Sequence, residues 1–146
     1  MEELVDSLKI AFANSFVFHL KAWGYHWNVE GEDFYQYHEM LGKIYEEVQD
    51  SLDETAEHIR QLESYAPFSM ERIKQLSEIA EDLKIPSTAG MASELIQANE
   101  IVLQRLSRTF ELSEANGQYG LSDFVAGRIA AHKKHAWFLR SSIKKR

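Results

Sequence analysis

A chain of 146 residues with 45% apolar and 27% charged residues has the size and composition of one globular domain, spanning residues 1–146. It contains no cysteine, which excludes a disulfide framework and any thiolate metal site, so a transition-metal site would need imidazole and carboxylate ligands. The formal net charge of -7 repels phosphate backbones and makes nucleic acid a poor candidate partner.

The N-terminal segment is acidic and amphipathic, whereas a signal peptide would be basic and then continuously apolar. No uninterrupted apolar run approaches membrane-spanning length, so we expect a cytoplasmic protein without membrane association. Apolar residues instead recur at helical spacing, which predicts an all-α chain. A first helix should run to about Asn28 and end in the loop around Gly31. A second, from about Phe34 to near Ser64, should end before Pro67 and form an antiparallel hairpin with the first.

The second half of the sequence predicts a connecting helix and two more long helices. The connecting helix should run from about Ser69, its N-cap, to Leu83. A third long helix should follow residues 86–88 and end at Gly117, which suits a left-handed terminal position. Ser122 should cap the fourth. This order predicts a four-helix bundle with a short extra helix in the crossover between helices two and three.

Two carboxylates lie four residues apart in the middle of the predicted second helix. Asp53 and Glu57 should project from one face of that helix, within reach of a common cation. Solvated acidic pairs at this spacing are common, so the pair does not establish a metal site by itself. A solvated acidic face is the better interpretation of four other acidic residues on this helix: Glu46, Glu47, Asp50 and Glu54.

Two histidines flank the predicted bend between the first two helices. His26 lies in the last turn of the first helix and His38 in the second turn of the next, so the hairpin can bring their imidazoles together. A hydrogen-bonded core role is the alternative for either histidine alone, and two at one bend weaken it. Asp53 lies fifteen residues beyond His38, a rise of about 22 Å that no side chain spans. A two-fold dimer with antiparallel second helices would instead set the histidines of one subunit against the carboxylates of the other, making two identical sites.

The motifs around these residues resemble a known family. Y-H-W-N-V-E-G at 25–31, Y-H-E-M at 37–40 and L-D-E-T-A-E-H-I at 52–59 are similar to the ferroxidase signature of the Dps family of mini-ferritins. The gaps of twelve, fifteen and four residues between the two histidines and the two carboxylates match the family pattern. The segment H-K-K-H-A-W-F-L-R-S at 132–141 resembles the last helix of the family.

The resemblance implies a ferritin-like fold, a dodecameric hollow shell and ferroxidase sites formed between subunits by His26, His38, Asp53 and Glu57. It also implies that ferrous iron is oxidised, preferentially by hydrogen peroxide, and that ferric mineral is stored inside, which protects against oxidative damage. Carboxylates stabilise ferric iron, and neutral imidazoles hold ferrous iron. Trp27 would lie near the metal and could intercept radical by-products, although plain packing explains an aromatic residue there equally well.

Three further positions bear on this resemblance. Gly42 stands where family members often have an acidic residue, and Trp23 where a lysine is frequent, so a second iron position would be weak. Asp123 corresponds to the region lining the three-fold pores through which iron enters, although a carboxylate near a helix N-terminus is favourable in its own right.

Two other metal sites can be weighed against the shared one. An intra-subunit di-iron bundle needs Glu-x-x-His on two helices, and none of the six histidines has a glutamate three positions before it. His132 and His135 lie three apart on the predicted last helix and could bind a metal, but the apolar stripe that contains His132 favours a core role.

DNA binding is the other activity of the resembling family, usually carried by a lysine-rich extension. Here Lys144, Lys145 and Arg146 stand alone at the C-terminus, where they also complement a helix dipole. We therefore do not expect DNA compaction without metal ions or a partner. Gly42 and Trp23 leave open a rival function, a structural or DNA-associated cage with weakened ferroxidase activity.

Overall fold

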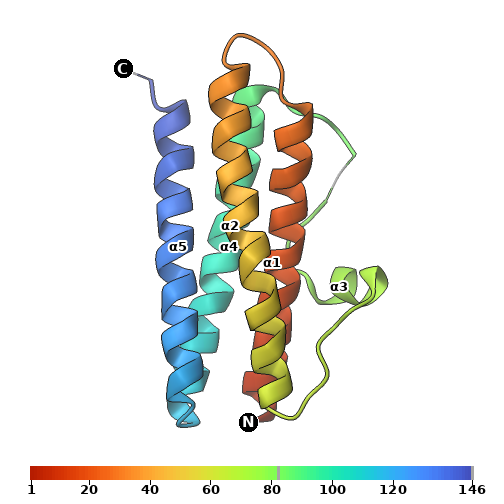
Figure 1. The fold of residues 1–146 in the computed structure, drawn as a ribbon, viewed down its shortest axis with the longest axis vertical. Helices are drawn as coiled ribbons and strands as arrows, with labels where there is room; N and C mark the ends of the chain where they lie inside the picture. The colour runs from red at the N-terminus through yellow and green to blue at the C-terminus, as the bar shows by residue number, and fades with distance from the viewer. Residues whose placement is uncertain (82, 146) are drawn as a thin grey trace.

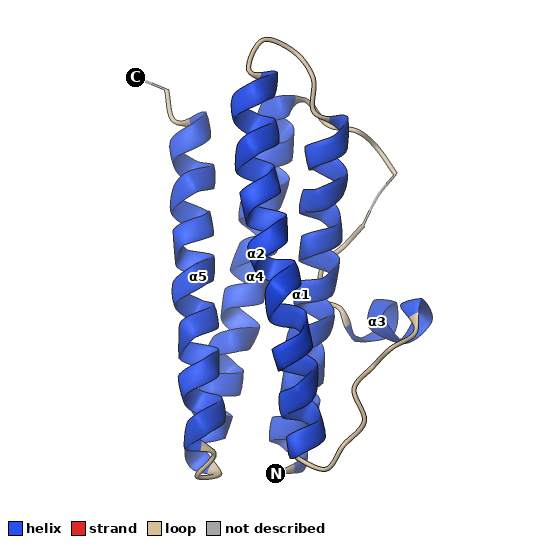
Figure 2. Ribbon diagram, viewed as in Figure 1, coloured by secondary structure: helices blue, strands red, loops and turns tan. Residues whose placement is uncertain are grey.

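The computed structural model describes residues 1–81 and 83–145, and within them it contains helices and no strand (Figure 2). The predicted all-α class is therefore confirmed. None of the described helices combines the length and apolar character needed to cross a membrane. The five helices, in chain order, are α1 (Glu2–Asn28), α2 (Phe34–Gln61), α3 (Met70–Leu76), α4 (Thr88–Ala115) and α5 (Tyr119–Ile143).

The four long helices form a bundle whose long crossover lies between α2 and α4 (Figure 1). Helices α1 and α2 make one antiparallel hairpin, and α4 and α5 make the other. The crossover carries α3 along the outer side of α1 and returns the chain to the end of the bundle where α2 began. Helices α2 and α4 therefore run in the same direction, as expected of a ferritin-like bundle with one long crossover.

The core lies between the apolar stripes of these helices. The stripe predicted for α1 is buried almost throughout its length, from Leu4 through Phe18 to Ala22. Burying a leucine, valine or phenylalanine side chain contributes roughly 1.5–3 kcal/mol, so these stripes supply most of the force that holds the hairpins together. The stripes of α2, α4 and α5 face it through buried residues that include Leu41, Ile44, Val48, Leu95, Val102, Val125 and Leu139.

Two of the predicted helix ends, at Ser69 and at Gly117, are formed by the expected chemistry. The Ser69 hydroxyl accepts the backbone N–H of Arg72 and caps α3. Helix α4 begins at Thr88, slightly earlier than predicted, because the Ser87 hydroxyl accepts the backbone N–H of Gly90 and caps it. Gly117, just beyond α4, has φ of 67°, a left-handed conformation that glycine adopts without a Cβ penalty.

The prediction that the connecting helix reaches Leu83 is wrong, because α3 ends at Leu76. Beyond that point the backbone N–H of Glu78 donates to Asn14 Oδ1 at 2.8 Å, and the Glu78 carboxylate accepts from Asn14 and from Arg105. These partners on α1 and α4 hold the chain in an extended conformation. A helix continuing through Glu78 could not make the same hydrogen bonds. Leu83, predicted as the last apolar residue of this helix, is fully exposed. Asp82 and Arg146 lie outside the described residues.

Two other helix ends differ from the prediction. Helix α5 begins at Tyr119 with Gln118 as its N-cap, so Ser122 is an internal residue and not the cap. The Ser122 hydroxyl instead lies close to Gln118 O and to the Glu114 carboxylate, at 3.1 and 2.9 Å, and ties the start of α5 to the end of α4. Helix α2 ends at Gln61, slightly before the predicted end.

Candidate metal site

The structure brings His26 and His38 together at the bend between α1 and α2, as the hairpin geometry predicts. Their ring centroids are 3.8 Å apart and their planes differ by 13°. The Nδ1–H of His26 donates to the backbone carbonyl of His38 at 2.6 Å, and the Nδ1–H of His38 donates to that of His26 at 2.7 Å. A carbonyl oxygen can only accept, so both Nδ1 atoms carry hydrogen. Each neutral imidazole therefore keeps the lone pair of Nε2, the form in which histidine binds metals.

The short bend of residues 29–33 makes this pairing possible. Gly31 has φ of 112°, which favours glycine and lets the chain reverse over a few residues. The backbone N–H of Val29 bonds to Tyr25 O at 2.9 Å, and the Val29 side chain is buried, which fixes the start of the bend. On the far side, the Phe34 ring stacks on His38 with centroids 5.0 Å apart. Both imidazoles are thus oriented before any metal binds.

The stacking of the two rings bears on how they would bind metal. The lone pair of Nε2 lies in the ring plane, with a metal about 2.1 Å away along it. The ring planes of His26 and His38 differ by only 13° and the rings are stacked 3.8 Å apart, so the two planes do not intersect close to the rings. In this arrangement the imidazoles of His26 and His38 cannot both hold one ion in their ring planes, so each would address a metal position of its own.

A cluster of aromatic rings surrounds the pair. Tyr45 lies against His26 with centroids 5.3 Å apart, and Trp23 stacks on Tyr45 at 5.3 Å and 16°. Trp27 packs on Trp23 at 4.6 Å, and 56% of it is exposed. Trp27 therefore reaches the histidine pair through Trp23 and Tyr45. Tyr45 falls on the apolar spacing of α2, and this spacing carries no signal of a position beside the histidine pair.

The two predicted carboxylates lie elsewhere on α2. Asp53 and Glu57 are both exposed, and neither has a hydrogen-bond or ion-pair partner among the described residues. About 22 Å of helix separates Asp53 from His38. Within residues 1–81 and 83–145, no three histidine, aspartate or glutamate side chains are close enough to hold a metal ion. Within one subunit the imidazoles therefore lie at one end of α2 and the carboxylates toward the other, and we call them the two half-sites of the predicted metal site.

Asp123 lies near the carboxylate half-site. It is exposed in the second turn of α5, which starts at the end of the bundle opposite the α1–α2 bend (Figure 1). The ring of the next residue, Phe124, packs against His58 with centroids 4.8 Å apart, and His58 directly follows Glu57. Asp123 therefore shares this end of the bundle with Asp53 and Glu57.

Glu47 is not part of a solvated acidic face, contrary to the sequence-based interpretation. Arg128 on α5 donates to both carboxylate oxygens of Glu47, at 2.5 and 3.0 Å, and the Nε2–H of His135 donates to one of them at 2.8 Å. Burial alone would raise the pKa of Glu47, but the hydrogen bonds from His135 and Arg128 and their charge outweigh it and lower the pKa to about 2. Sequence spacing could not reveal this ion pair, since its members are 81 residues apart.

His132 extends the contacts around Glu47. We call the whole network the bundle ion pair; it is formed by Glu47, Arg128, His135, His132 and Asn99. His132 is fully buried; its Nδ1–H donates to Asn99 Oδ1 at 2.7 Å, and its Nε2 accepts from Arg128 at 3.3 Å. The predicted core role of His132 is confirmed. A guanidinium thus occupies the bundle interior, where intra-subunit di-iron proteins carry their metal ligands.

The bundle ion pair should make folding sensitive to acid. The pKa of Glu47 is lowered to about 2 from 4.5, so its contribution is present above pH 4.5 and is lost as the pH falls toward 2. Burial and, to a smaller extent, the charge of Arg128 lower the pKa of His132 well below 6.5. Below pH 6.5 the unfolded chain therefore binds a proton at this histidine more readily than the folded chain does, which favours unfolding. We expect the melting temperature to fall steadily from pH 6.5 downward. The melting-temperature difference between the parent and Glu47→Gln should shrink below pH 4.5. A difference that does not change with pH would contradict the role of the ionised Glu47 in this network.

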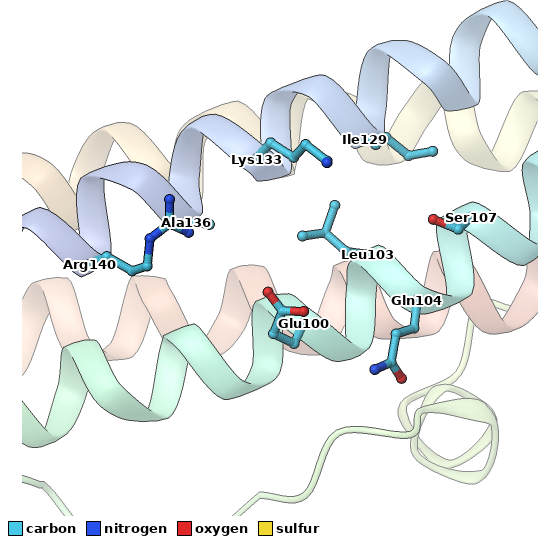
Figure 3. Close-up of a pocket in the computed structure, with 8 residues that line it drawn as sticks. All are labelled: Glu100, Leu103, Gln104, Ser107, Ile129, Lys133, Ala136 and Arg140. Atoms are coloured by element: carbon cyan, nitrogen blue, oxygen red, sulfur yellow. The ribbon is translucent and has the colours of Figure 1, made fainter.

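A groove of about 540 Å³ runs between α4 and α5 (Figure 3). Leu103 and Ile129 form its apolar middle, while Glu100, Lys133 and Arg140 bring charge to its walls. Among the described residues that line the groove, Glu100 is the one carboxylate, and none is a predicted site residue. The groove therefore lies apart from the predicted metal site.

Comparisons with known proteins agree with this geometry. A family profile described as a ferritin-like domain matches residues 5–146. The chain is 32% identical to an uncharacterised low temperature-induced protein of Nostoc, over 96% of this chain and 79% of that protein. It is 26% identical to DNA protection during starvation protein 2 of Bacillus anthracis, over 97% of each.

Solved structures give the same result. A Dps protein from Vibrio cholerae O1, described as a member of a broad superfamily of ferritin-like diiron-carboxylate proteins, is 27% identical with a TM-score of 0.93. The match covers 98% of this chain and 90% of that one. The chain belongs to the ferritin-like family and, within it, to the Dps proteins.

Proposed function

We propose that this protein is an iron-storage mini-ferritin that oxidises ferrous iron at sites shared between two subunits and holds the ferric product in a homo-oligomeric cage. The observation that carries the proposal is the division of ligands along α2. Two oriented imidazoles with free Nε2 atoms lie at one end, and two exposed carboxylates without polar partners among the described residues lie about 22 Å away. An antiparallel two-fold contact between the α2 helices of two subunits would place the imidazoles of each subunit beside the carboxylates of the other, which makes two identical sites.

The chemistry of these donors suits iron as the substrate. The imidazoles of His26 and His38 would hold ferrous ions, and the partner's carboxylates, equivalent to Asp53 and Glu57, would neutralise the ferric product. With hydrogen peroxide as oxidant, two ferrous ions give one electron each, the O–O bond breaks, and two protons from solvent complete two water molecules. The two metal positions addressed by the stacked imidazoles match this two-electron requirement.

Two further residues take supporting roles in this proposal. Trp27 is linked to His26 by three ring contacts through Trp23 and Tyr45 and would pack beside the shared site, where it could donate an electron to a stray radical. Asp123, exposed at the carboxylate end of the bundle, would attract ferrous ions to the pores between subunits.

Native mass and iron loading test this proposal together. Twelve copies of a 16.9 kDa chain should elute as a particle of about 200 kDa by light scattering. After ferrous iron and peroxide are added anaerobically, the ferric product should co-elute with that particle. A cage that takes up no iron would favour the rival structural function, and a monomer that oxidises iron would overturn the shared site.

A further inference from the structure

Gly42 is an unexpected residue in the middle of α2. Glycine inside a helix costs about 1 kcal/mol relative to alanine, so an interior glycine needs a local reason. A Cβ atom built on Gly42 would lie 3.0 Å from Cε1 and 3.1 Å from Nδ1 of His26. The same construction at the helical glycines Gly24 and Gly127 meets nothing within 4 Å. Gly90 also has close neighbours, but they are Pro86 and Ser87 just before its own helix, whereas the close approach at Gly42 is to a side chain of another helix.

His26 has little freedom to yield to such a side chain. One face of its ring stacks on His38 at 3.8 Å, and Tyr45 packs against it at 5.3 Å. Its Nδ1–H is held at 2.6 Å by the carbonyl of His38, one turn before Gly42 on the same helix. A side chain at position 42 would push the ring away from α2, which lengthens this hydrogen bond and disturbs the stack.

We infer that Gly42 is a positioning residue for the metal site, whose missing side chain lets the imidazole of His26 lie against the backbone of α2 and fixes the direction of its Nε2. The inference rests on the proposed function, because it concerns the same half-site. With glycine at this position no carboxylate stands at residue 42 beside the imidazoles, which agrees with the proposal that the acidic ligands come from the partner subunit.

Cobalt(II) titration of the assembled protein tests this role without redox chemistry. Gly42→Ala should bind cobalt about tenfold more weakly than the parent, the size of loss expected when the orientation of a metal ligand is disturbed. Gly24→Ala and Gly127→Ala are matched controls that should keep the parent affinity. These controls should melt slightly higher because alanine favours the helix, whereas Gly42→Ala should gain nothing.

A double-mutant comparison shows whether Gly42 acts through His26. In a His26→Ala background, Gly42→Ala should cause no further loss of cobalt affinity, because the ring that it displaces is absent. An equal loss in both backgrounds, or parent affinity in Gly42→Ala alone, would overturn the inference. His26→Ala by itself tests the proposed function separately: unchanged cobalt binding in that variant would overturn the site and not merely the role of Gly42.

Discussion

His26→Ala should lower the initial rate of ferrous oxidation by more than about 100-fold, because disturbing only the orientation of a metal ligand already costs 10–100-fold. The variant removes an imidazole whose Nε2 is free and whose Nδ1 is held by His38 O. The rate is measured from the absorbance of ferric product after peroxide addition. His58→Ala is the matched control, since it removes a half-buried histidine that pairs with Glu54 and belongs to neither half-site. Parent-like oxidation by His26→Ala would contradict the assignment.

Asp53→Ala should cause a loss of similar size, although Asp53 lies about 22 Å along α2 from His38. Asp50→Asn, an exposed carboxylate on the same helix, should leave the rate unchanged. A loss confined to the histidine variant would mean that the carboxylates come from elsewhere.

The second large effect concerns stability. Glu47→Gln should destabilise the fold by about 2 kcal/mol, which is less than the roughly 3–5 kcal/mol for breaking a fully buried ion pair because 39% of the Glu47 side chain remains exposed. The change leaves the guanidinium of Arg128, which is 9% exposed, without its carboxylate. For a chain of this length the melting temperature should drop by about 5 °C.

A double-mutant cycle separates the bundle ion pair from a general effect of the substitution. Glu47→Gln combined with Arg128→Met should be less destabilised than the sum of the two single variants, because the second change removes the stranded charge. All variants are compared at one subunit concentration, since assembly also shifts the melting temperature. Asp50→Asn is the control and should melt with the parent. Strict additivity would show that the two residues do not act as a pair.

The helices were predictable where local chemistry decides them. Ser69 and Gly117 mark helix ends because a hydroxyl cap or a left-handed glycine acts within a few residues. The end of α3 was not predictable, because the apolar spacing continues through Ile79 while Asn14, some 64 residues away, binds the backbone of Glu78. Helical periodicity does not show which distant side chain will compete for a backbone group.

The closeness of His26 and His38 was predictable for the same reason, since a short bend forces residues twelve apart together. The orientation of the rings was not, because it depends on reciprocal bonds to backbone carbonyls. Nor did the sequence reveal that Gly42 leaves room for His26, or that Glu47 pairs with Arg128. These contacts join different helices, and residue spacing along one helix cannot show them. The pairing of Asp53 and Glu57 with a partner's histidines stays a prediction.

Subunit mixing is the most direct test of a site shared between two chains. Chains carrying His26→Ala and chains carrying Asp53→Ala, each inactive alone, are co-assembled in equal amounts, and mixed particles are isolated with two affinity tags. Each site would draw its imidazoles from one subunit and its carboxylates from another, so about one site in four should be intact. The mixed particles should recover about a quarter of the parental oxidation rate. No recovery in particles shown to contain both chains would contradict the shared site.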